Sequence, residues 1–90
     1  MAHYCSAAEL EDLADVLAEI RTWSDVVEKK PNVFYVRRDP FFHVHMLSGG
    51  TRRADVKGRR GWTQIELPRP VLPAARRALL STLRLRYREK

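Results

Sequence analysis

FFHVHML, residues 41–47, is the strongest strand signal in the chain. Its apolar side chains alternate with His43 and His45, as in a strand whose successive side chains point to opposite faces of a sheet. Turn residues separate it from four weaker strand signals, at residues 26–29, 33–37, 53–57 and 62–67. Connections this short do not allow parallel crossovers, so we expect an antiparallel meander of four to five strands.

A helix is expected at each end of this sheet. Ser6 and Glu9 have the spacing of a capping box. The leucines that follow recur at helical spacing and predict a helix over residues 7–22. Pro73 suits the first turn of a second helix that runs to the end of the chain. We therefore predict a single α+β domain over residues 1–90, with both helices on one face of the sheet.

Composition excludes several classes of protein. Hydrophobic residues make up 44% of the 90 residues, which is too many for a disordered chain. No apolar run approaches the roughly 18 residues of a membrane span, and the first residues do not resemble a signal peptide. The lone cysteine, Cys5, cannot form an intramolecular disulfide. The sequence therefore predicts a cytoplasmic protein that does not associate with membranes.

The net charge of +6 is unevenly spread along the chain. Residues 1–30 hold seven acids and three bases, whereas residues 31–90 hold fourteen bases and four acids. This asymmetry has two interpretations: a basic face that binds a polyanion, or an acidic helix packed beside basic elements.

Strand alternation divides the side chains of the sheet into two sets. One set is almost wholly apolar and should face the two helices. Two helices cover only one face of a small sheet, so the second set should lie on an open face that binds a ligand. Its members are Tyr35, Arg37, Phe41, His43, His45, Arg53, Asp55, Lys57, Trp62 and Glu66. The alternative is a solvated face on which the rings pack laterally and the charges make ordinary cross-strand pairs.

Within this set, His43 and His45 form an HxH pattern that places both imidazoles on one face. With a carboxylate from a neighbouring strand, Asp55 or Glu66, they would suit zinc or ferrous iron. The set His43, His45 and Asp55 is therefore a candidate metal site, although Arg53 and Lys57 beside Asp55 could neutralise it instead. The same histidines could serve as general acid and base near neutral pH.

Cations gather around the two glycine-bounded loops of the sheet. We expect nucleic-acid contact from Arg52, Arg53, Lys57, Arg59 and Arg60. Aromatic rings on the same face would supply stacking surfaces for bases. The alternative is that the many arginines reflect composition alone.

Three segments carry a resemblance: EKKPNVFY (28–35), PFFHVH (40–45) and RADVK (53–57). Together they resemble a group of small bacterial proteins of unassigned function, whose pattern is roughly KPxVFY, PFxHFH and ADVR, followed by a C-terminal helix. This chain has Val44 where that pattern often has an aromatic residue, and Met46 where it has an acid. The resemblance implies the fold and a special status for His43, His45 and Asp55.

Three functions follow from these patterns, in order. The first is a binding module that uses the open face for nucleic acid or another anionic partner. The second is a homodimer in which a second copy covers the aromatic face. The third is a small enzyme that uses a metal or the histidines.

Overall fold

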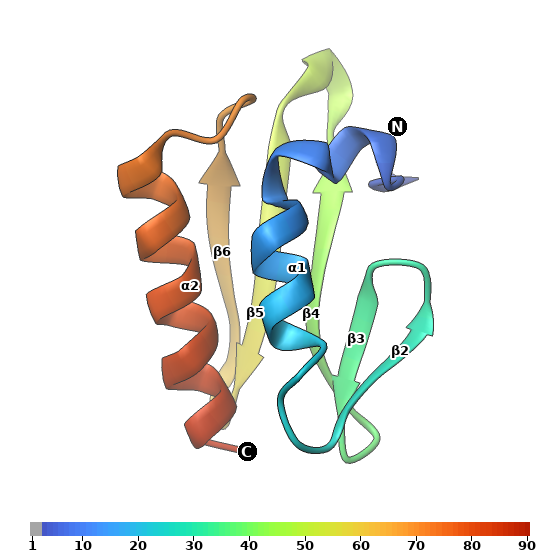
Figure 1. Ribbon diagram of the computed structural model, residues 1–90, viewed down its shortest axis with the longest axis vertical. Coiled ribbons are helices and arrows are strands. Elements are labelled where there is room, and N and C mark those ends of the chain that lie inside the picture. Colours follow the sequence, from blue (N-terminus) through green and yellow to red (C-terminus); the bar gives the residue numbers. More distant parts are fainter. Residues whose placement is uncertain (1–2) are drawn as a thin grey trace.

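The protein is a two-layer α+β structure in which one antiparallel sheet carries both helices on the same face (Figure 1). The computed structural model describes residues 3–90. Five strands follow one another in the order β2-β3-β4-β5-β6, and a short strand, β1, pairs with the end of β4. The elements are β1 (His3–Tyr4), η1 (Ala8–Leu13), α1 (Ala14–Ile20), β2 (Val26–Lys30), β3 (Val33–Val36), β4 (Asp39–Met46), η2 (Ser48–Gly50), β5 (Arg52–Gly58), β6 (Gly61–Leu67) and α2 (Pro73–Arg88).

The predicted meander and both terminal helices are confirmed. The apolar set of strand residues is buried against α1 and α2, with Phe34, Phe42 and Val56 among its least exposed members. Leu79 and Leu83 bring α2 into the same core. No helix in residues 3–90 is long and apolar enough to cross a membrane.

The N-terminal helix is shorter and more irregular than predicted. The capping box is present: Ser6 N–H donates to the Glu9 carboxylate at 2.9 Å, and Glu9 N–H donates to Ser6 Oγ at 3.3 Å. However, the first turns are a 3-10 helix, η1, which is interrupted at Leu10 (φ −115°, ψ 16°). One physical reason is that Arg52 donates to the Glu9 carbonyl, the acceptor that an α-helix would use for residue 13.

Phe41 does not lie on the open face, and this prediction was wrong. Phe34 pairs with Phe42 while Tyr35 pairs with Pro40, so Phe41 is an extra residue in β4, as in a β-bulge. The bulge resets the alternation and turns Phe41 into the core. There its ring lies 6.4 Å from that of Trp23 and 6.2 Å from that of Tyr87.

Arg37 also lies away from the open face. Strand β3 ends at Val36, and Arg37 and Arg38 form the turn to β4 with positive φ angles of 49° and 74°. The Arg37 side chain donates to the Asp25 carboxylate at 3.1 Å and to the Lys90 carbonyl at 3.1 Å. The turn was predicted at Asp39 and Pro40, two residues later than it occurs, because these are stronger turn residues than two arginines.

Arg52 is buried rather than available to nucleic acid, which corrects a third prediction. Its side chain is fully shielded and makes a bidentate pair with Asp12, both bonds being 2.8 Å long. It also donates to the carbonyls of Glu9 and Pro68. Further bases pair with acids of the N-terminal helix, Arg76 with Asp15 and Arg84 with Glu19. These pairs support the interpretation of an acidic helix packed beside basic elements.

We predict that Asp12→Asn destabilises the protein by roughly 3–5 kcal/mol, because it leaves a buried guanidinium without its counter-charge. Glu11→Gln is the control, since Glu11 is exposed and makes no ion pair with another described residue. Urea unfolding of both variants measures the difference. Equal stability of the two variants would contradict the role given to Asp12.

The pH dependence of stability provides a second test of the same pair. The hydrogen bonds from Arg52 lower the pKa of Asp12 to about 2, below its ordinary value of 3.8. Because the pKa is depressed in the folded state, the stabilisation is complete above pH 4 and is lost as the pH falls toward 2. We therefore expect the stability difference between wild type and Asp12→Asn to shrink over that range.

Candidate metal centre

The candidate site forms where β4 and β5 pair, on the face that α1 and α2 leave open. His43 lies opposite Asp55, and His45 lies opposite Arg53. Phe42, Val44 and Ala54, which alternate with these residues, are buried on the helix side. Alternation along two neighbouring strands therefore brings these four side chains together on the open face.

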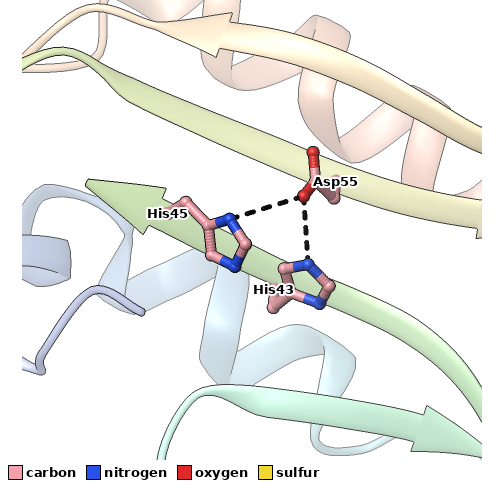
Figure 2. A group of neighbouring side chains, drawn as sticks. All are labelled: His43, His45 and Asp55. Atoms are coloured by element: carbon pink, nitrogen blue, oxygen red, sulfur yellow. Dashed lines mark hydrogen bonds and ion pairs between the residues drawn. The ribbon is translucent and has the colours of Figure 1, made fainter. Parts of the chain in front are cut away.

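The Asp55 carboxylate is the centre of this cluster (Figure 2). His43 Nε2 lies 3.0 Å from Asp55 Oδ2, and His45 Nδ1 lies 3.9 Å from the same oxygen. Arg53 donates to both carboxylate oxygens, at 2.9 and 3.1 Å. The same Arg53 Nη2 lies 3.2 Å from His45 Nδ1. All three candidate metal ligands thus converge on a small volume that the guanidinium of Arg53 borders.

Aromatic rings border the cluster on two sides. The Tyr4 ring centroid lies 5.2 Å from that of His43 and 4.8 Å from that of His45. The Trp62 ring lies 5.0 Å from that of His43. Sequence reasoning missed Tyr4, because β1 is only two residues long and its alternation with Cys5 is too short to be a signal. Tyr4 reaches the site because His3 and Tyr4 pair with Met46 and His45.

Hydrogen bonding specifies the protonation of the histidines. A guanidinium only donates, so His45 Nδ1 accepts from Arg53 and its proton lies on Nε2. A carboxylate only accepts, so His43 Nε2–H donates to Asp55. Burial lowers the pKa of His43 below its usual 6.5, although Asp55 pulls it back upward. At neutral pH, His43 is therefore an uncharged imidazole oriented by a carboxylate.

This arrangement can do two kinds of chemistry. Two imidazoles and one carboxylate, with ligand atoms within 4.8 Å of one another, are a suitable donor set for zinc or ferrous iron. An imidazole held by a buried carboxylate is also the arrangement of a general base.

The remaining predicted residues have other partners or, like Glu66 opposite Arg53 on β6, make no ion pair with the cluster. Tyr35 packs under the Lys29 ammonium, 4.6 Å from its ring centroid. Lys57 pairs with Asp39 at 2.9 Å, and Glu66 is exposed at the β6 edge without an ion pair to any described residue. Of the five predicted nucleic-acid residues, Arg52 is buried, whereas Arg53 and Lys57 are paired with acids. Arg59 and Arg60 remain exposed, in the turn between β5 and β6.

Comparison with known proteins adds no family to this description. No family model matches the chain, and no curated protein or solved structure matches it either. The resemblance of residues 28–57 to small bacterial proteins therefore stays an expectation.

We predict that His43 titrates below pH 6.5 and that Asp55→Asn lowers its pKa further, because the carboxylate is the group that raises it. Two-dimensional NMR of the histidine ring nitrogens measures both values. Glu66→Gln is the control, since it removes a carboxylate from the same face without touching His43. An increase in the His43 pKa on loss of Asp55 would contradict the claim that the carboxylate raises the pKa of this ring.

Proposed function

We propose that this protein is a small binding module that holds a divalent transition metal, zinc or ferrous iron, between His43, His45 and Asp55. The observation that carries the proposal is the convergence of two imidazole nitrogens and one carboxylate oxygen from paired strands. Two histidines and a carboxylate leave coordination positions open, so a bound ion could take a further ligand at the exposed side of the sheet.

Arg53 is the residue with which a metal would compete. Its Nη2 lies within hydrogen-bond distance of Asp55 Oδ2 and His45 Nδ1, which are two of the three candidate ligand atoms. About a third of the Arg53 side chain is exposed, so the guanidinium has room to turn toward solvent. Cation and guanidinium would share these acceptors, and the affinity for metal would reflect that competition.

The charges of the face favour a metal over an extended polyanion. A polyanion needs several free cations along its path. Arg53 and Lys57 already pair with Asp55 and Asp39, and Arg52 is part of the core. What is left of the predicted basic surface is the pair Arg59 and Arg60 at one end of the sheet.

Exposed rings beside the cluster support a second candidate, the homodimer. Tyr4 and Trp62 are 46% and 44% exposed and both contact the histidine pair. A second copy laid over this face would bury both rings. Light scattering after size exclusion tests this candidate, and a monomer at high protein concentration would reject it.

The cellular location belongs to the same proposal. Cys5 is the only cysteine of the chain and is buried, and burial raises the pKa of its thiol. A buried thiol with a raised pKa is unreactive. This supports a role for Cys5 as a core residue. We propose a cytoplasmic location, because a reducing compartment keeps a single thiol unpaired.

We predict that the protein binds Zn²⁺ and Co²⁺, and that His43→Ala or His45→Ala weakens binding at least tenfold, because each removes one ligand of three. Isothermal titration calorimetry measures the affinity for Zn²⁺, and the visible absorbance of bound Co²⁺ reports its ligands. His3→Ala is the matched control, since His3 pairs with Glu9 outside the cluster. Unchanged binding in the His43 and His45 variants would reject the proposed centre.

We predict the opposite effect for Arg53→Gln, which should tighten Zn²⁺ binding at least tenfold by removing the competing cation. Arg38→Gln is the control for net charge, because Arg38 is exposed and lies in the β3–β4 turn. If Arg53→Gln binds zinc no better than Arg38→Gln, then the guanidinium and the metal do not share acceptors.

A further inference from the structure

A hollow lies at the tip of the β5–β6 hairpin, and its chemistry differs from that of the candidate metal centre. Its volume is about 490 Å³, which is within the range of small-molecule sites. The hairpin turn forms one side, and the last turns of α2 form the other. The lining residues that matter for its chemistry are Arg59, Arg60, Trp62, Thr63, Arg86 and Glu89.

Contacts between the hairpin and the helix hold this hollow together. Glu89 accepts from Arg59 N–H at 3.0 Å and from Arg86 Nη1 at 2.7 Å. Arg86 Nε also donates to Thr63 Oγ1 at 3.2 Å. Gly58 permits the close approach, because a Cβ atom there would lie 2.2 Å from Glu89 Oε1. The walls of the hollow are thus built by specific contacts.

The charge of the hollow is positive. Glu89 is the only carboxylate among its lining residues, and Arg86 already pairs with it. The side chains of Arg59 and Arg60 are exposed and make no hydrogen bond or ion pair with any described residue. The turn itself needs a glycine at Gly61, where φ is +122°, but it does not need two arginines. Two exposed guanidinium groups that line the same hollow can bind a phosphate.

Trp62 adds a flat apolar surface next to these cations. Its ring is 44% exposed, and it follows Arg60 by two residues. Its described ring contact is with His43, on the open face of the sheet. Stacking of a base on an exposed aromatic ring beside arginine–phosphate contacts is how proteins bind single-stranded nucleic acid without sequence preference.

We infer that this hollow binds a nucleotide unit of single-stranded nucleic acid, with its base on Trp62 and its phosphate on Arg59 and Arg60. The site is local, covering the hairpin tip, in contrast to the long basic surface expected from the sequence. None of the candidate metal ligands lines this hollow, although Trp62 borders both sites through its ring contact with His43.

The test is fluorescence anisotropy of a labelled oligothymidylate of ten nucleotides, measured in EDTA over a series of salt concentrations. In EDTA the result is independent of metal, so this inference and the proposed function can fail separately. We expect salt-sensitive binding by the wild-type protein. Arg59→Gln/Arg60→Gln should bind at least tenfold more weakly and reduce the slope of log affinity against log salt by ~0.7, the value for one lost phosphate contact on a single strand.

Matched variants separate a local site from net charge. Arg38→Gln/Arg77→Gln removes the same two charges from exposed positions outside the hollow and should bind like wild type. Trp62→Ala should weaken binding at least tenfold, whereas Trp62→Phe should keep most of it because a stacking surface remains. Circular dichroism checks that each variant is folded.

The outcomes distinguish the sources of the ligand and define failure. If thymidine monophosphate competes as well as the oligonucleotide, the hollow is a site for free nucleotides with the same chemistry. If only the oligonucleotide binds, a strand is the ligand. Equal losses in the two double-arginine variants would mean that net charge alone attracts the strand, and would overturn the inference, as would an absence of binding by the wild-type protein.

Discussion

The ion pair between Arg52 and Asp12 joins two parts of this fold that lie 40 residues apart in sequence. Arg52 begins β5, Asp12 belongs to η1, and the guanidinium also binds the Pro68 carbonyl just beyond β6. Asp12 accepts in turn from the Val71 N–H at 2.6 Å, just ahead of α2. A buried guanidinium is costly unless its charge is paired, and both Nη atoms of Arg52 donate here while Nε has no partner, so this pair constrains how the N-terminal helix, the sheet and the approach to α2 meet.

The burial of Arg52 also determines which side chains of β5 lie at the candidate metal centre. Because Arg52 points into the core, the next residue of β5, Arg53, must point to the opposite face, and Asp55 follows it there. Strand β4 then presents His43 and His45 in register. Two neighbouring arginines of identical chemistry thus take different roles: one stabilises the fold, and the other lies against the carboxylate of the proposed site.

Many of the basic side chains pair with carboxylates within the molecule. Acids of the N-terminal helix pair with bases from β5 and α2, and Asp39 contacts both Lys57 and Lys90. Other basic side chains have no ion-pair partner among the described residues, and two of these, Arg59 and Arg60, lie in the β5–β6 turn and line one hollow with Trp62. The two proposed sites follow from this distribution. The metal centre lies where Arg53 is paired with Asp55, and the nucleotide site lies where Arg59 and Arg60 have no ion-pair partner.

Residue patterns alone predicted the fold class, the order of the elements, the capping box and the sharing of one face by His43, His45, Asp55 and Trp62. These features depend on short-range geometry, since alternation and helical spacing are properties of neighbouring residues. The burial of Phe41 and Arg52, the position of Arg37 and the contact of Tyr4 with the histidines depend on the folded chain. Each involves a partner distant in sequence: Trp23 and Tyr87 around Phe41, an aspartate 40 residues from Arg52, Lys90 beside Arg37, and β4 beside Tyr4. Local patterns carry no information about such partners, because the free energy that favours them comes from contacts made only when the chain has folded.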